Sequence, residues 1–419
     1  MADIAIIAAA LALVSLIQKR IATWPLTGPM LFVCGGMLLG PDGLNVFKLQ
    51  LGNESITLVA ELTLALLLFS DASRINTAKL RQSIGIPARL LGIGLPLTIA
   101  FGTVMASVLL MDLRWSEAAL VAAILAPTDA ALGQAVVTDT RVPVLVRQSL
   151  NVESGLNDGM VVPIIGVFAL LVAEDEVEPV STVVLEALKE IGLGVGVGVA
   201  TGVAIGLLTA WARRNQWADT TGIRVATFGG AVAGFGTSVA AGGNGFIAAF
   251  VAGLALHIVS GEEAGHQAEL AEDLGQVGAT ATFFIFGALM VLPAFEFASW
   301  AIAACAIVTL TVGRMLPVAI ALLGTGLKPP TVAFMGWFGP RGLASMLFGL
   351  LIVGERGAEV DGLFSVIALV VFASVMLHGL SAAPLAAKYG AWYNDEPPDD
   401  MMESGIFAEL RLRGARDKR

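Results

Sequence analysis

One short stretch of the sequence places four side chains that could bind a proton or a cation inside a long apolar run. This stretch, NVESGLNDG at residues 151–159, contains Glu153, Ser154, Asn157 and Asp158. Side chains four positions apart on a helix lie one turn above each other, so Glu153 stacks with Asn157. Ser154 stacks with Asp158 in the same way. The stretch therefore predicts one helix with two adjacent polar stripes.

A second stretch, APTDA at residues 126–130, offers oxygen atoms of another kind. Pro127 has no backbone N–H and obstructs the carbonyl group four residues earlier, so a helix here should be kinked or unwound near Thr128. Carbonyl groups freed in this way could bind a cation, and Asp129 adds a carboxylate beside them. Carboxylate, hydroxyl and carbonyl oxygens are the ligands that a hard cation such as sodium takes.

Two arginines lie in later apolar runs, Arg314 in TVGRMLPV and Arg341 in GWFGPRGLASMLF. An ionisable side chain in the middle of a membrane costs at least about 2.5 kcal/mol, so it normally faces a partner or a watery cavity. Either arginine could form a structural ion pair with Glu153, in which removing one partner would strand a charge. Gly339 and Pro340 should break the helix beside Arg341.

The composition shows what kind of chain must position these residues. Hydrophobic residues make up 56% of the 419 residues, charged residues only 14%, and the mean hydropathy is +0.83. The apolar residues form runs of roughly 17 to 28, long enough to cross a hydrocarbon layer as helices. They do not alternate with polar residues as the strands of a membrane barrel do. The sequence therefore predicts an all-α polytopic membrane protein, and its net charge of −10 excludes a nucleic-acid footprint.

The apolar runs predict about thirteen transmembrane helices, near residues 3–17, 25–40, 54–71, 87–111, 117–138, 146–173, 182–212, 222–239, 244–260, 277–292, 297–323, 331–353 and 361–386. The two segments with expected breaks, the fifth and the twelfth, are seven apart, so they run in opposite directions through the membrane. Two inverted repeats require this relation. In transporters of that kind, discontinuous helices cross at an ion site near the bilayer midplane.

The distribution of basic residues predicts the orientation. With the N-terminus outside, most Lys and Arg fall in cytoplasmic loops and in the tail, as the positive-inside rule expects. The opposite side holds Lys48, Arg114, Lys189 and Arg356. We expect a transmembrane domain at 1–390, a short cytoplasmic tail at 391–419, and a permanent first helix, because its basic residues follow the apolar run. The acidic segment 261–276 is interpreted as a solvated cytoplasmic loop, and the glycine-rich segment 192–206 as close helix packing.

Five motifs in a fixed order resemble one known family. They are APTDA, ESGLNDG, GNGFIAAFVAGLAL (243–256), GPRGLAS (339–345) and LHGLSAAP (377–384). Together they resemble the NhaP-type monovalent cation/proton antiporters of the sodium/hydrogen exchanger family, over nearly the whole membrane domain. The resemblance implies thirteen helices, a core domain that moves against dimerisation helices, a homodimer, and exchange of sodium for protons.

The resemblance also implies roles for the site residues. Asp158 would bind either a proton or the cation, and Asp129, Ser154 and the unwound backbone at Thr128 would supply further oxygens to the transported sodium. Asn157 stands where electrogenic relatives have a second Asp, so electroneutral exchange is implied. An Asn cannot titrate, which keeps the charge count fixed.

The resemblance further implies that Glu153 is ion-paired rather than transporting, with Arg314 as its expected partner and Arg341 as the alternative. Many family members have Asp before and Pro after the PTD motif, where this sequence has Ala126 and Ala130. These two departures concern the fine shape of the site and its ion preference.

We therefore expect secondary active transport by alternating access, in which sodium or lithium and protons compete for Asp158, with a role in pH homeostasis. The expected partners are monovalent cations, protons, the lipid bilayer of a prokaryotic inner membrane and a second copy of the chain. No cofactor and no enzymatic activity are expected.

Three other functions stay open at this point. Potassium could replace sodium as the main substrate of the antiport. A channel or a sodium-coupled solute symporter could use the same inverted-repeat site, although the central spans offer few polar or aromatic side chains for a solute. An intramembrane aspartyl protease would use Asp129 and Asp158 as a dyad, but it would not need Asn157 or two later arginines. His257 and His378 are placed near span ends, and His266 in a loop.

Overall fold

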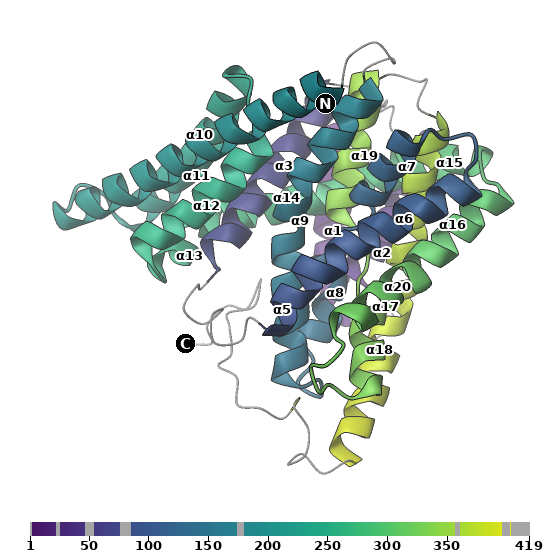
Figure 1. Ribbon diagram of the computed structural model, residues 1–419. Helices are drawn as coiled ribbons and strands as arrows, with labels where there is room; N and C mark the ends of the chain where they lie inside the picture. The colour runs from purple at the N-terminus through teal and green to yellow at the C-terminus, as the bar shows by residue number, and fades with distance from the viewer. Residues whose placement is uncertain are drawn as a thin grey trace. The chain divides into compact units, whose positions relative to one another are not determined.

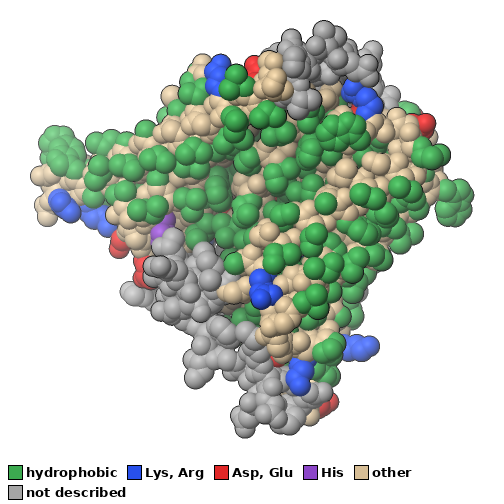
Figure 2. All heavy atoms as spheres, in the orientation of Figure 1, with side chains coloured by type: hydrophobic (Ala, Val, Ile, Leu, Met, Phe, Trp, Pro, Cys, Tyr) green, Lys and Arg blue, Asp and Glu red, His purple; other side chains and the backbone are tan. Residues whose placement is uncertain are grey.

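A computed structural model describes residues 2–21, 26–46, 54–75, 85–173, 180–356, 361–395 and 403. In this part of the chain all regular structure is helical, and no strand occurs (Figure 1). Eight of its helices are long and apolar enough to cross a membrane, and four shorter helices are also apolar. Hydrophobic side chains cover much of the face shown in Figure 2, where charged side chains are few. The predicted all-α class is confirmed.

Helical residues lie at each of the thirteen predicted segments, while the number of membrane crossings stays a prediction. In chain order the elements are α1 (Ala2–Ile21), α2 (Gly28–Leu39), α3 (Glu54–Ser73), α5 (Gly85–Arg89), the π-helical η1 (Leu90–Gly94), α6 (Leu95–Leu109), α7 (Trp115–Ile124), α8 (Ala130–Val137), α9 (Val144–Ala173), α10 (Val180–Arg214), α11 (Thr220–Ala240), α12 (Gly245–Ser260), α13 (Glu263–Gln267), α14 (Glu269–Phe286), the π-helical η2 (Gly287–Val291), α15 (Leu292–Glu296), α16 (Trp300–Leu310), α17 (Val312–Ala321), α18 (Pro329–Trp337), α19 (Leu343–Arg356) and α20 (Asp361–Asp395).

The chain forms two compact units. The first consists of Met1–Thr57, Ser83–Asn157 and Thr280–Arg419, and the second of Leu58–Gln82 and Asp158–Ala279. The division falls inside α9, between Asn157 and Asp158. The expected tail at 391–419 begins within α20, and beyond Asp395 the structure describes Glu403 alone, so this boundary stays a prediction.

In the first unit, α2 packs against η2 at very short range. A Cβ at Gly36 would collide with the Phe284 carbonyl group, and a Cβ at Gly287 would collide with the Val33 carbonyl group. Only glycine allows the two backbones to approach this closely, as small residues do at helix contacts in membranes. In the same unit α20 packs against α8, α16, α18 and α19, so it is the helix on which most of the unit's other helices pack.

In the second unit, α10 packs along α12 through glycines spaced four apart. A Cβ at Gly198 would lie 2.7 Å from the Ala248 carbonyl oxygen, and a Cβ at Gly202 would collide with the Ala252 carbonyl group. Residues four apart share one helix face, so this repeat makes a continuous groove for the partner helix. The interpretation of the glycine-rich segment as helix packing is confirmed.

The expectation of a loop at 261–276 is wrong, because the chain there forms α13 and the first turns of α14. The physical reason is visible in the sequence: Ala264, Ala268 and Ala271 are spaced as one helix face, and all three are fully buried. Abundant acidic residues masked this pattern.

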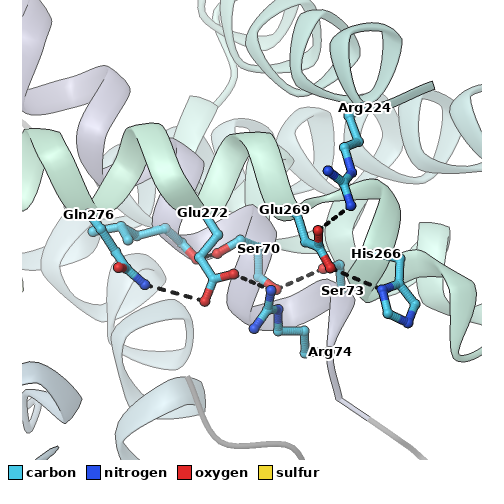
Figure 3. A network of polar contacts seen from close by, with 9 residues as sticks. Ser70, Ser73, Arg74, Arg224, His266, Glu269, Glu272 and Gln276 are labelled. Carbon is cyan, nitrogen blue, oxygen red and sulfur yellow. Dashed lines mark hydrogen bonds and ion pairs between the residues drawn. The ribbon is translucent and has the colours of Figure 1, made fainter. Parts of the chain in front are cut away.

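The acidic side chains of this segment are held by basic partners in the second unit. Arg74, which directly follows α3, forms an ion pair with Glu272, which is buried, and Arg224 of α11 forms one with Glu269 (Figure 3). His266 Nδ1 lies 3.0 Å from Glu269 Oε1 (Figure 3). Glu272 is therefore part of the helix packing rather than of a solvated face.

Candidate functional site

The first predicted break lies where Pro127 places it. Helix α7 ends at Ile124, α8 begins at Ala130, and residues 125–129 between them are not helical. The second break also follows its proline, because α18 ends at Trp337, α19 begins at Leu343, and residues 338–342 are not helical. Both interruptions belong to the first unit.

The two breaks are bonded to each other through Asp129. Its backbone N–H donates to the Pro340 carbonyl oxygen at 2.8 Å, and its Oδ2 accepts from the Leu343 N–H at 2.6 Å. Its Oδ1 accepts from the Leu132 N–H at 3.3 Å. The Asp129 carboxylate thus caps the N-termini of both α8 and α19, where negative charge is favourable. Gly342 is required here, because a Cβ would collide with Asp129 Oδ2.

Arg341 makes the reciprocal connection from the second break to the first. Its side chain is fully buried, and its Nη1 donates to the Ala126 carbonyl oxygen at 2.9 Å. The Ser345 hydroxyl donates to the Ile124 carbonyl oxygen at 2.6 Å. Ile124 is the last residue of α7 and Ala126 follows it in the break, so both carbonyls lie at the C-terminal end of α7, where positive charge is favourable. Each break therefore supplies the charged group that completes a helix end at the other.

Glu153 of α9 pairs with Arg314 rather than with Arg341. Arg314 Nη1 lies 2.6 Å from Glu153 Oε1, and Nη2 donates to Oε2 at 2.7 Å. Both residues are 2% exposed. Two parallel charge-assisted hydrogen bonds are the strong arrangement for arginine and a carboxylate. The structure thus shows the pair with Arg314, the partner that the resemblance named first, and not with the alternative, Arg341.

Arg314 is positioned by an interruption that the sequence analysis missed. Between α16 and α17 the backbone at Thr311 has φ −113° and ψ −95°, and its hydroxyl donates to the Ile307 carbonyl oxygen at 2.5 Å. Arg314 follows in the first turn of α17. The sequence does contain residues that could mark this interruption: the β-branched Thr311, Gly313 and Pro317. Each of these residue types is also common in an uninterrupted span, so they could not identify the break.

Three neutral polar side chains meet beside the first break. Asn157 Nδ2 donates to Thr128 Oγ1 at 2.7 Å, and Thr128 Oγ1 lies 2.9 Å from Ser154 Oγ. All three residues are buried, and the Asn157 Oδ1 receives no hydrogen bond from the described part of the chain. Buried polar atoms are normally satisfied, so this oxygen and the two hydroxyl groups form a polar cluster suited to a small polar or charged guest.

Asp158 follows Asn157 on α9 and is half-buried. It is the first residue of the second unit, so the structure brings seven of the eight expected site residues together in the first unit and leaves Asp158 at the division. Its role stays a prediction, as do those of Thr128, Asp129, Ser154 and Asn157 as ion ligands. Within the described ranges no three His, Cys, Asp or Glu side chains form a group that could hold a metal ion.

Two further residues of α20 contact the second break and were not expected there. The Arg341 N–H donates to Ser374 Oγ at 2.6 Å, and His378 Nε2 lies 3.0 Å from the Trp337 carbonyl oxygen. The sequence analysis placed His378 near a span end, but α20 continues to Asp395, which leaves His378 in the helix interior. A single Ser or His in an apolar run carries no signal of such a role.

Comparison with known proteins identifies the family. A family model described as "Sodium/hydrogen exchanger, transmembrane" matches residues 6–388. The chain belongs to the sodium/hydrogen exchanger family. The resemblance stated from the motifs is confirmed, and so is the expectation that the chain is not an enzyme, since the family consists of transporters. With its apolar helices, this exchanger family member is a multi-pass membrane protein.

Relatives of this family member include proteins described as potassium/proton antiporters. A protein of Alkalimonas amylolytica described as "K(+)/H(+) antiporter NhaP" is 24% identical over 88% of this chain and 63% of its own length. One of Shewanella sp. (strain ANA-3), described as "K(+)/H(+) antiporter NhaP2", is 30% identical over 46% of this chain and 33% of its own length. The chain thus spans less than two thirds of these relatives.

The fold of this family member matches a solved structure over nearly its whole length. The sodium proton antiporter MjNhaP1 from Methanocaldococcus jannaschii, at pH 8, superposes with a TM-score of 0.73 at 20% identity. The match covers 92% of this chain and 98% of that one. At this identity the likeness concerns the fold, which is the antiporter fold that the sequence predicted.

Proposed function

We propose that this protein exchanges sodium or lithium for protons by alternating access, with the cation and the proton competing for Asp158. The observation that carries the proposal is the polar cluster of Thr128, Ser154 and Asn157, which is buried beside a helix break. A buried set of hydroxyl and amide groups next to interrupted helices is the environment that transporters offer to a small cation. Family membership supports the same function.

The charges of the first unit's site support electroneutral exchange. Glu153 and Asp129 are negative, Arg314 and Arg341 are positive, and all four are buried, so their formal charges cancel. Asn157 adds no titratable group. The proposed exchange then changes charge only at Asp158, which one proton or one monovalent cation neutralises equally well. One proton is therefore exchanged for one cation, and the net charge carried does not differ between the two half-cycles.

In the proposed cycle, each residue has a limited task. Asp158 holds the proton or the cation, and Ser154 with the backbone and hydroxyl of Thr128 supplies neutral oxygens that only the cation uses. Asn157 keeps Thr128 in place through the 2.7 Å hydrogen bond from its amide. Asp129 supplies a further carboxylate oxygen near the cation, and its hydrogen bonds to Pro340 and Leu343 also hold the two breaks together.

Potassium is the second candidate substrate. The curated relatives that match this chain are described as potassium/proton antiporters, whereas MjNhaP1 is described as a sodium proton antiporter. Potassium needs a larger cavity than sodium but takes the same oxygen ligands, so the ligand set serves both ions. We place sodium first because the motifs resemble those of antiporters that exchange sodium for protons.

We further propose that the protein acts as a homodimer in a prokaryotic inner membrane, with its N-terminus outside and its C-terminus in the cytoplasm. The distribution of Lys and Arg supports the orientation, and the motifs shared with NhaP-type antiporters support the dimer. A contribution to pH homeostasis follows from proton exchange.

The test uses purified protein in liposomes that contain a pH-sensitive dye. Sodium, lithium and potassium are added in turn to wild type and to Asp158→Asn, with and without a clamped membrane potential. A cation-driven pH change that is lost in the variant and independent of voltage supports the proposal, and the order of the ions names the substrate. A wild-type protein that gives no pH change with any of the three cations would refute it.

A further inference from the structure

The break between α18 and α19 removes several hydrogen bonds of a continuous helix, one of which would join Arg341 to Trp337. In an α-helix each N–H donates to the carbonyl group four residues earlier, so the Arg341 N–H would donate to Trp337. In this structure residues 338–342 are not helical. Arg341 is fully buried and Trp337 is partly buried, so both backbone groups need other partners.

Helix α20 supplies both partners from residues one turn apart. Ser374 Oγ accepts from the Arg341 N–H at 2.6 Å, and His378 Nε2 lies 3.0 Å from the Trp337 carbonyl oxygen. Ser374 Oγ and His378 Nδ1 are themselves 3.2 Å apart. The two side chains thus span the gap that the break leaves, and they connect the same two backbone groups that a continuous helix would join.

Both ring nitrogens of His378 lie at hydrogen-bond distance from a carbonyl oxygen. Nε2 is 3.0 Å from the Trp337 carbonyl oxygen, and Nδ1 is 3.0 Å from the Ser374 carbonyl oxygen and 3.2 Å from Ser374 Oγ. A carbonyl oxygen only accepts, so a bond from Nε2 to Trp337 requires a hydrogen atom on Nε2. The Arg341 N–H, Ser374, His378 and the Trp337 carbonyl thus form one continuous series of polar contacts.

The surroundings of Ser374 and His378 hold these contacts in place. Ser374 is 0% exposed and His378 is 1% exposed. The Trp337 indole N–H donates to Ser381 Oγ at 3.0 Å, so α20 binds the end of α18 at a second point. Trp337 O also accepts from the Gly339 N–H at 2.9 Å, which uses its second lone pair.

We propose that Ser374 and His378 are positioning residues that hold the second break open and thereby fix the place of Arg341. Because the Arg341 guanidinium bonds the Ala126 carbonyl, its place also determines the backbone beside Thr128. The clamp formed by Ser374 and His378 thus acts on the site indirectly, through Arg341. Its effect on transport rests on the proposed function, whereas its effect on the break does not.

The first test measures the break itself, by hydrogen exchange of the backbone amides in peptides that cover residues 338–343. His378→Phe keeps a ring of similar size but removes both nitrogen atoms, and His378→Gln restores one donor and one acceptor. A net hydrogen bond contributes about 0.5 to 1.5 kcal/mol, which corresponds to exchange faster by roughly twofold to tenfold. We expect this acceleration in His378→Phe and in Ser374→Ala, and near wild-type exchange in His378→Gln.

His257 provides the matched control. It is also buried, and its Nδ1 lies 3.0 Å from the Ser73 carbonyl oxygen, but it belongs to α12 in the second unit. His257→Phe should leave the exchange of residues 338–343 unchanged. If His378→Phe does not fold, Ser374→Ala still tests the clamp, because it removes a single oxygen atom.

The second test measures cation-driven exchange in liposomes. If the break keeps its clamped geometry in only a fraction of molecules, the apparent KM for the cation rises by the inverse of that fraction. We expect KM to rise about twofold to tenfold in His378→Phe and Ser374→Ala, with recovery in His378→Gln. A His378→Phe protein with wild-type KM and wild-type amide protection would overturn the proposal. A wild type without exchange would remove the proposed function alone, since amide protection tests the clamp separately.

Discussion

The ion pair between Glu153 and Arg314 predicts a strong coupling that can be measured in a double-mutant cycle. Replacing either residue by Met leaves the other charge buried at 2% exposure without its partner. Breaking a buried pair in this way costs about 3 to 5 kcal/mol of unfolding free energy. Replacing both residues by Met removes both charges and fills the space with apolar atoms, a change that is often neutral or stabilising. The double variant should therefore be more stable than either single variant.

The assay is equilibrium unfolding in mixed detergent micelles, followed by the fluorescence of the seven tryptophans. The coupling energy is the unfolding free energy lost by the double variant minus the sum lost by the two singles, and we expect its magnitude to exceed about 3 kcal/mol. The exposed pair of Arg213 and Glu263 serves as control, with a distance of 2.9 Å and side chains 45% and 58% exposed. Its coupling should be at most about 1 kcal/mol. Losses at Glu153 and Arg314 that add within about 0.5 kcal/mol would refute the reasoning.

Three further substitutions test other parts of the structure. Asn157→Asp adds a titratable group, so an active variant should move net charge and respond to a clamped potential in liposomes; indifference to voltage would contradict the charge argument. Asp129→Asn keeps one acceptor but turns an N–H toward one of two backbone donors, which should lower the unfolding free energy by about 1 to 3 kcal/mol; an unchanged stability would argue against the double cap. Gly202→Ala forces a Cβ into the Ala252 carbonyl group and should lower the unfolding free energy in detergent by about 1 to 3 kcal/mol. Gly196→Ala is the control, because a Cβ there meets nothing within 4 Å. Equal effects of the two substitutions would contradict the packing argument.

The sequence was sufficient to predict the helical class, the apolar segments and both proline-linked breaks. These features depend on local chemistry: an apolar run satisfies its own backbone as a helix, and Pro127 and Pro340 lack the N–H that a helix requires. The pairing of Glu153 was reduced to two arginines by charge alone. The family resemblance named Arg314 as the expected partner, and the path of α17 brings its guanidinium to Glu153.

The features that sequence reasoning missed depend on contacts between distant elements. The helical structure within 261–276 was hidden because Glu272 is acidic, and the burial of Glu272 makes sense only with Arg74, just after α3, as its partner. Ser374 and His378 became meaningful only when α20 was placed against Trp337 and Arg341. A Ser in an apolar helix more commonly bonds its own backbone, so its type alone could not predict this contact.

The reciprocal caps of the two breaks also constrain how the chain is made. Arg341 lies 215 residues after Ala126, whose carbonyl group accepts its hydrogen bond. Leu343 lies 214 residues after Asp129, whose carboxylate accepts from the Leu343 N–H. At a synthesis rate of roughly 5 to 20 residues per second, the first break waits about 10 to 45 seconds for its partners. During that time its free carbonyls and its carboxylate must be satisfied by water or by the insertion machinery. The fifth predicted segment therefore enters the membrane before the partners of its break exist, and the last third of the chain supplies those partners.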